Sequence, residues 1–422
     1  MAYDKLKLSE RSHESKGEIN MRKAYIVAAK RSAIGSFMGG LTNIPLVDLG
    51  ATVLKETIKQ AKIDPKDIDE VLVGNVIAAG LGQNIGRQVS IAAGIPVEVC
   101  AQSINMLCGS GLKAVMEATL RIQAGFGDIY VAGGVESMTN APFLVPSKIR
   151  NGVKMGDMKL VDSMLHDGLT DGMYNIHMGV TADNIAKKYN ISREDQDAFA
   201  YASQQKAIAA IDSGRFKDEI VPVEVPGRKG TVTVFDTDEH PNRTTTPEKM
   251  AKLRPAFTPD GTVTAGNASG INDGASFTIV VSEDALKKYN LTPLAEIVGF
   301  GQGGVDPRVM GLGPTPAILN ALKYADMKIE DMELVELNEA FAAQSLGVIH
   351  ELEEATGMDR EAFMAKTNVN GGAIALGHPV GASGNRILVT LLYEMAKRDL
   401  KIGLASLCIG GGQGCAVIVK RP

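Results

Sequence analysis

The feature that most constrains the fold is an internal repeat between the two ends of the chain. The helix, charged segment and apolar strand of residues 51–73 return without a gap at residues 315–337. Within this match the segment Asp67–Val71 falls on Asp331–Val335. The repeat is far longer than the unit of a regular solenoid. It predicts one α/β unit that is used twice and packed about a pseudo-twofold axis.

Further elements extend the repeat. The strands expected at 24–28 and 129–133 have counterparts at 295–299 and 404–408, and helices alternate with strands in both copies. This alternation predicts an α/β fold with buried parallel strands. The competing interpretation is that both halves share only generic α/β patterning.

The repeat also divides the chain into domains. We expect an N-terminal α/β half at 21–139 plus about 260–290, and a C-terminal α/β half at 291–422. Residues 140–259 break the pattern with a methionine-rich loop, a helix and short strands, which predicts an inserted loop domain. Residues 1–20 are polar and mixed in charge, and we expect a disordered extension there.

Cys108 is a candidate nucleophile. It lies between an apolar approach at 101–107 and a predicted helix at 112–123. At a helix N-terminus the partial positive charge favours a thiolate. Gly109 and Gly111 leave the backbone bare, so that a substrate can approach the sulfur. The same pattern also fits a small buried core cysteine before a tight turn.

A histidine segment occupies the equivalent position of the second copy. His378 is followed by Pro379 and precedes the helix expected at 385–397. The pseudo-twofold would bring Cys108 and His378 to one crevice at the strand ends, where open α/β sheets bind ligands. There the imidazole could take the proton of the thiol. A lone histidine is more often a core or surface residue, and the other five histidines lack such a setting.

Other polar segments lie at similar places. Asn338 follows a strand and could donate its amide to an oxyanion, although an Asx turn or a helix cap explains it equally well. Cys408 and Gly410 lie in a turn between apolar strands, where Cys408 could reach the same crevice and Gly410 could present a bare N–H to an anion. Ser269, in the glycine-rich loop 265–274, is a candidate ligand contact.

Together these segments resemble the thiolase family, in its acetyl-CoA C-acetyltransferase branch, over about residues 23–420. Two cysteines with a histidine and an asparagine fit thiolases better than the ketoacyl synthases, which are similar in fold but lack the second cysteine. The resemblance implies duplicated α/β halves in an α-β-α-β-α layering. The matching motifs are the Cys108 segment, Gly133–Met138, the Ser269 loop, Asn338–Phe341, the His378 segment and the Cys408 segment.

The resemblance implies catalytic roles. Cys108 would carry the acetyl group as a thioester, and His378 would activate it and line one oxyanion hole with a water held by Asn338. Cys408 would remove the α-proton of the second acetyl-CoA in condensation, or protonate the leaving group in thiolysis. The N–H groups of Cys108 and Gly410 would form the other oxyanion hole.

The resemblance also implies the substrate contacts. Ser269 and His177 match positions that contact the pantetheine arm, and Met178 matches one beside the acyl group. The implied reaction is the reversible condensation of two acetyl-CoA to acetoacetyl-CoA and CoA by a homotetramer, with no metal or cofactor because the CoA thioesters are substrates. The extra polar residues at 351–366 and the extension before Met21 depart from the family pattern.

Two other functions compete with this interpretation. One is a 3-ketoacyl-CoA thiolase of broader chain length in fatty-acid degradation, although the segment 177–179 resembles the short-chain biosynthetic branch. The other is a non-catalytic CoA-binding scaffold. The presence of a reactive residue at every expected catalytic position argues against it. A secondary redox role is open as well, because low-pKa thiols in one crevice oxidise readily.

The composition limits the kinds of partner and the cellular compartment that we expect for this chain. A net charge of −5 gives no electrostatic footprint for nucleic acid. No apolar run approaches the ~20 residues that span a bilayer. The four cysteines include no C-x-x-C pair, which indicates a reduced, cytoplasmic protein without a zinc site.

Overall fold

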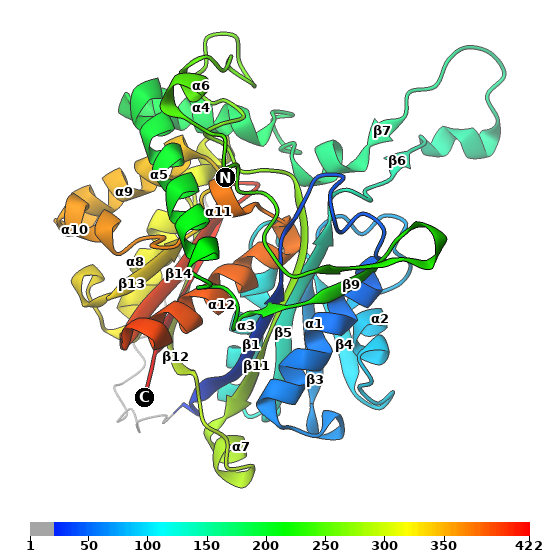
Figure 1. The fold of residues 1–422 in the computed structure, drawn as a ribbon, viewed down its shortest axis with the longest axis vertical. Helices are drawn as coiled ribbons and strands as arrows, with labels where there is room; N and C mark the ends of the chain where they lie inside the picture. Colours follow the sequence, from blue (N-terminus) through cyan, green and yellow to red (C-terminus); the bar gives the residue numbers. More distant parts are fainter. Residues whose placement is uncertain (1–20) are drawn as a thin grey trace, which may run out of the picture.

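The computed structural model describes residues 21–422, so the expectation for residues 1–20 lies outside the described residues. Its core is one long mixed β-sheet (Figure 1). In spatial order its strands are β13 (Leu334–Leu337), β14 (Ile402–Ile409), β15 (Gln413–Lys420), β12 (Ala295–Gly304), β1 (Ala24–Ser32), β11 (Asn272–Ser282), β5 (Ile129–Ser137), β3 (Glu70–Gly74) and β4 (Cys100–Ile104).

The strand order confirms the internal repeat. β1 and β12 meet at the centre as antiparallel neighbours. Outward from them, β11, β5 and β3 on one side correspond to β15, β14 and β13 on the other. The place of β4 is matched in the second copy by an isolated parallel bridge between Val335 and Thr367. The two copies are therefore related by a pseudo-twofold between β1 and β12.

The buried parallel strands that the sequence predicts form only part of the sheet. β3 pairs in parallel with β4 and β5, and β13 with β14, but β11 and β15 run antiparallel to their neighbours. A tight turn after β14 returns the chain directly as β15, which only an antiparallel pair permits. Every residue of β11 is buried, so both faces of this strand are covered.

The helices form the layers between and outside the two halves of the sheet. α3 (Ser110–Gln123) and α12 (Val380–Arg398) pack against each other and share one apolar cluster with strands of both halves. α1 (Leu46–Ala61) and α2 (Ile85–Ala92) cover the outer face of the N-terminal half, and α8 (Pro314–Ala325) and α9 (Ala342–Thr356) cover that of the C-terminal half. The α-β-α-β-α layering is thus confirmed.

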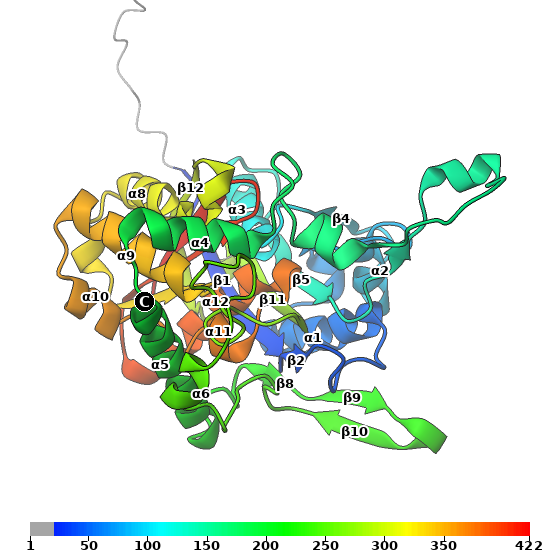
Figure 2. The ribbon, with the colours of Figure 1, turned by 90° about the horizontal axis from the view of Figure 1, so that it is seen from above.

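The segment between the halves covers the C-terminal half and also forms an arm. α4 (Met178–Tyr189) and α5 (Arg193–Asp212) pack on α9, while the β6–β7 arm projects from the body (Figure 1, Figure 2). The domain boundaries stay a prediction. The remaining elements are β2 (Gly35–Ser36), β6 (Phe143–Leu144), β7 (Val161–Asp162), β8 (Ile220–Val221), β9 (Val223–Pro226), β10 (Val232–Phe235), α6 (Pro247–Ala251), α7 (Glu283–Lys288), α10 (Arg360–Ala365) and α11 (Ala373–Leu376).

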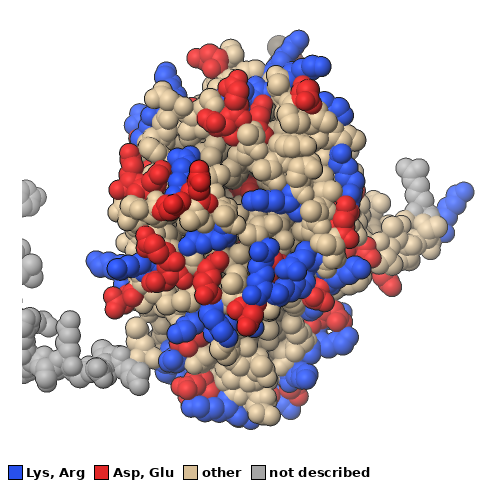
Figure 3. All heavy atoms as spheres, turned by 60° about the vertical axis from the view of Figure 1, so that its left-hand side comes forward, with Lys and Arg blue, Asp and Glu red and all other residues tan. Residues whose placement is uncertain are grey.

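The surface shows no field of a single sign on the face that Figure 3 presents. Basic and acidic side chains are interspersed there among neutral ones. Within residues 21–422, no helix combines the length and the apolar character needed to cross a membrane.

Glycines allow α3 and α12 to approach each other closely. A Cβ on Gly111 would lie 2.9 Å from the Asn385 nitrogen, and one on Gly134 would lie 2.0 Å from the Gly381 carbonyl oxygen. This corrects the role expected for the glycines beside Cys108. Gly109 faces Ile409, 2.4 Å from its Cδ1, and Gly111 faces α12, so both permit packing between the halves instead of exposing the sulfur to substrate.

Gly134→Ala tests this packing. The added methyl group meets a backbone oxygen that cannot rotate away, so we expect a loss of about 1–3 kcal/mol in the free energy of unfolding. The midpoint of urea unfolding measures it. Gly172→Ala, where a Cβ meets nothing within 4 Å, is the matched control. Equal midpoints for the two variants would contradict the close-packing account.

Candidate active site

A cavity of about 410 Å³ brings together residues from every part of the chain. Cys108 comes from the N-terminal half, His378 from the C-terminal half, and His177 and Met178 from the segment between them. Ser269, from the loop before β11, completes this set. The structure therefore places these residues around one cavity, whose walls are mostly apolar.

A tight turn presents Cys108 two residues before α3. Leu107 has φ +46°, a left-handed conformation that is uncommon outside glycine and that collects at functional sites. The Asn105 side chain accepts a hydrogen bond from the Leu107 N–H at 3.0 Å. The Ser110 hydroxyl accepts from the Met106 N–H at 2.9 Å and donates to the Leu107 carbonyl at 2.6 Å. Side chains on both sides therefore hold the strained turn in place.

Donors from both halves of the molecule converge on the Cys108 sulfur. The backbone N–H groups of Cys108 and of Gly410 both act to lower the pKa of the Cys108 thiol. Gly410 lies in the turn between β14 and β15, two residues after the buried Cys408. The two cysteines also interact electrostatically, and Cys108 contributes to raising the pKa of Cys408 after the larger effect of burial. The structure thus brings Cys108, Cys408 and Gly410 to one point.

His378 is held as a neutral base. Its Nδ1 lies 2.6 Å from the Ser383 hydroxyl, and that hydroxyl donates its single proton to the Pro379 carbonyl at 2.9 Å. Nδ1 must therefore carry the ring proton, which leaves a lone pair on Nε2. Nε2 is buried and has no partner among the described residues. Burial lowers the pKa of His378 to about 3.

Asn338 presents a free amide at the end of β13. Its backbone N–H donates to the Ser406 carbonyl at 2.9 Å, which fixes the position of the residue. Its side chain is buried, and both amide atoms lack a partner in the part of the chain that the structure describes. The alternatives of an Asx turn or a helix cap are therefore wrong. A buried amide without a partner is costly unless a ligand or water uses it.

This geometry can be compared with known proteins. Residues 24–284 match the family model Thiolase, N-terminal domain, and residues 291–421 match Thiolase, C-terminal domain.

The chain belongs to the thiolase family.

Relatives and solved structures cover nearly the whole thiolase chain. An acetyl-CoA acetyltransferase of Pseudomonas aeruginosa is 53% identical over 401 residues, which span 95% of this chain and 100% of that one. The structure of acetyl-CoA acetyltransferase from Syntrophomonas wolfei superposes with a TM-score of 0.92 at 43% identity, covering 96% of this chain and 100% of the other. Human mitochondrial 3-ketoacyl-CoA thiolase superposes with a TM-score of 0.89 at 45% identity, covering 95% and 99%.

The expectation that Cys108 of this thiolase is a thiolate at rest is wrong. Burial raises the pKa of Cys108 to about 11, despite the two N–H groups on its sulfur that act in the opposite direction. The free-energy cost of removing the thiolate from water exceeds the stabilisation that these two donors and the nearby helix provide. Cys108 and His378 are therefore both neutral at neutral pH, and the proton must move during the attack.

In this thiolase, hydrogen bonds within the protein fix His177 and Ser269, the residues expected to contact the pantetheine arm. The Nδ1 of His177 accepts from the Gly179 N–H at 3.0 Å, and its ring stacks on Phe257 with centroids 4.7 Å apart. Burial lowers the pKa of His177, so the ring is neutral and its Nε2–H is a donor. Ser269 is fixed by its backbone N–H, which donates to the Ala340 carbonyl at 2.9 Å.

Sequence reasoning missed Glu136. Its carboxylate accepts from the N–H groups of Val76 at 3.0 Å, Ile77 at 3.1 Å and Gly381 at 2.9 Å. It therefore ties the loop after β3 to the start of α12, close to His378. Burial raises the pKa of Glu136 to about 7 despite these donors. A lone acid within the mostly apolar strand 129–137 was the available signal.

Sequence reasoning also set His240 aside with the other histidines. The structure lines the cavity with it, and a Cβ on Gly270 would lie 2.3 Å from its ring. Burial lowers the pKa of His240. The signal was present, because His240 precedes Pro241 in the same way as His378 precedes Pro379.

The raised pKa of Cys108 predicts how its reactivity depends on pH. We expect alkylation of Cys108 by iodoacetamide, followed by mass spectrometry, to rise about tenfold per pH unit from about pH 7 to 10, because the thiolate fraction keeps growing until the pKa of about 11. Glutathione in the same tube should level off above about pH 8.5. No step is expected near pH 6.5, since His378 stays neutral. A plateau for Cys108 below about pH 8 would indicate a resting ion pair and contradict this account.

Proposed function

We propose that this thiolase condenses two molecules of acetyl-CoA to acetoacetyl-CoA and CoA, and catalyses the reverse thiolysis, through an acetyl group on Cys108. The observation that carries the proposal is that Cys108 and a buried, neutral His378 with an unprotonated Nε2 line one apolar cavity, while the buried Cys408 interacts with Cys108. The acetyl-CoA acetyltransferases that resemble this chain over nearly its whole length support the same reaction.

In the first half-reaction the Cys108 sulfur attacks the carbonyl carbon of acetyl-CoA while its proton moves to His378 Nε2. The bond between the carbonyl carbon and the CoA sulfur then breaks, and the departing thiolate takes the proton back from the imidazolium. The N–H groups that face the Cys108 sulfur are suited to the oxyanion that develops on the adjoining carbon. No metal or cofactor is required, because the CoA thiol is the leaving group.

In the second half-reaction the Cys408 thiol gives its proton to His378 Nε2, and the resulting thiolate removes an α-proton from a second acetyl-CoA. The enolate carbon attacks the acetyl carbonyl, the bond to Cys108 breaks, and the Cys108 thiolate takes the proton from the imidazolium. Burial and Cys108 raise the pKa of Cys408, and a thiolate of high proton affinity is suited to a weakly acidic C–H. The free amide of Asn338, acting through a water, would stabilise the enolate oxygen.

Single cysteine variants test this division of roles. Cys408→Ala should still accept label on Cys108 from labelled acetyl-CoA, but should lose condensation by about 10²–10⁴-fold, because only the base is missing. Cys108→Ala should do neither. Cys100→Ala, which changes an exposed cysteine, is the control. Near-normal condensation by Cys408→Ala would contradict the mechanism, and an unlabelled Cys108 in the unaltered protein would favour a CoA-binding scaffold.

A thiolase of broader chain length is the second candidate. The resemblance to human mitochondrial 3-ketoacyl-CoA thiolase and the apolar cavity favour it. Against it, Met178 reaches toward the catalytic turn, its sulfur 3.6 Å from where a Cβ on Gly410 would lie. This bulk limits the space for an acyl chain.

Paired thiolysis assays separate the two candidates. We expect kcat/KM for acetoacetyl-CoA to exceed that for 3-ketodecanoyl-CoA at least about tenfold, because a longer chain must displace Met178. Met178→Ala should reduce the ratio of the two kcat/KM values. Faster turnover of the longer substrate by the unaltered protein would establish the second candidate.

We also infer a homotetramer of the 44.7-kDa chain in the cytoplasm, on the strength of the family resemblance and the free cysteines among the described residues. Light scattering on the purified protein tests the assembly.

A further inference from the structure

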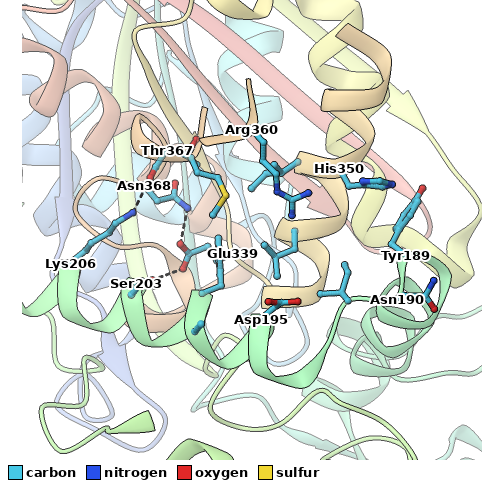
Figure 4. A pocket seen from close by; sticks show the side chains of 17 residues that line it. Tyr189, Asn190, Asp195, Ser203, Lys206, Glu339, His350, Arg360, Thr367 and Asn368 are labelled. Carbon is cyan, nitrogen blue, oxygen red and sulfur yellow. Dashed lines mark hydrogen bonds between the residues drawn. The ribbon is translucent and has the colours of Figure 1, made fainter. Parts of the chain in front are cut away.

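A second cavity, of about 520 Å³, lies apart from the active site on the C-terminal half (Figure 4). Its walls are α5, α9, α10 and the chain just after β13, and it shares no lining residue with the Cys108 cavity. Its volume falls within the roughly 300–1,000 Å³ that small-molecule sites occupy. The proposed reaction makes no use of this space.

One part of the second cavity is apolar. Another part carries polar groups that already form hydrogen bonds within the protein. Phe199, Leu346, Ile349 and Met364 supply the apolar wall. The polar floor is Glu339, which accepts from the Ser203 hydroxyl at 2.6 Å and the Asn368 amide at 2.8 Å. Asp195 at the lower rim accepts from the Ser192 hydroxyl at 2.7 Å. These acids are already hydrogen-bonded within the protein.

The two cationic side chains of the second cavity, Lys206 and Arg360, make only long contacts within the protein. The Lys206 ammonium donates to the Thr367 carbonyl at 3.4 Å, and Arg360 lies 3.5 Å from Glu353. Both contacts are long, whereas an ammonium has three donors and a guanidinium has five. In Figure 4 both side chains point into the cavity, Lys206 from α5 and Arg360 from α10. Lys206 also interacts electrostatically with Glu339 on the cavity floor, whose pKa its charge lowers against the larger effect of burial.

The polar stretch 351–366 supplies part of the cavity wall. It includes α10, which places one cation, Arg360, and one apolar side chain, Met364, on that wall.

We propose that this cavity is a second binding site, which takes a small amphipathic organic anion. Its carboxylate is held by Lys206 and Arg360, and its hydrocarbon part lies against the apolar wall formed with Phe199 and Met364. A carboxylate suits the guanidinium fork, and a chain of several carbons suits the apolar wall better than an inorganic anion does.

Titration calorimetry with octanoate tests the proposal on the full chain saturated with CoA, so that the active site is occupied. We expect one site per chain. Lys206→Met and Arg360→Met should each weaken octanoate binding at least about tenfold, and Lys323→Met, an exposed lysine on α8, should not. Ala202→Trp, which puts a large ring on the exposed wall, should block binding and keeps the test valid if a charge variant fails to fold.

Three results would overturn the proposal. One is no octanoate binding at millimolar concentration by the folded, active protein. Another is binding that CoA abolishes and that the cavity substitutions leave unchanged, which would assign octanoate to the active site. The third is inorganic phosphate binding as tightly as octanoate, which would exclude an amphipathic ligand.

Discussion

The close contact between α3 and α12 is the constraint on which the rest of the structure depends. Bare glycine faces let the backbones of the two helices meet, since a Cβ on Gly111 or Gly384 would fall within 3 Å of the opposite helix. Gly134 extends the same contact into the sheet, where a Cβ would lie 2.0 Å from Gly381. Each helix begins just after a reactive residue, Cys108 or His378. The distance between the helices thus sets the distance between nucleophile and base.

Burial at this contact decides the chemistry. It keeps the Cys108 thiol and the His378 imidazole neutral, and so makes proton transfer part of the attack. It also makes the N–H groups on the sulfur effective, because hydrogen bonds are stronger where water is excluded. Glu136 and Ser383 complete the arrangement, one fixing Gly381 and the other fixing the tautomer of His378.

The sequence was sufficient for the repeat of residues 51–73 and for the residues that meet in the cavity, because apolar periodicity and glycine-flanked polar residues are local signals. It was insufficient for strand direction, because the directions of β11 and β15 depend on which strands they pair with, and no local pattern records that pairing. The pKa of Cys108 depends on how much protein surrounds the sulfur, which no local pattern records. Gly109 and Gly111 were recognised but assigned to substrate access, because their neighbours Ile409 and Asn385 are distant in sequence.

Cross-linking by 1,3-dibromoacetone, read by mass spectrometry of the digested protein, tests the convergence of the two halves most directly. We predict one bridged product that joins the peptides of Cys108 and Cys408 within a single chain, and its loss when CoA or acetyl-CoA fills the cavity. Alkylation of the two cysteines on separate peptides, with no bridge between them, would contradict the account.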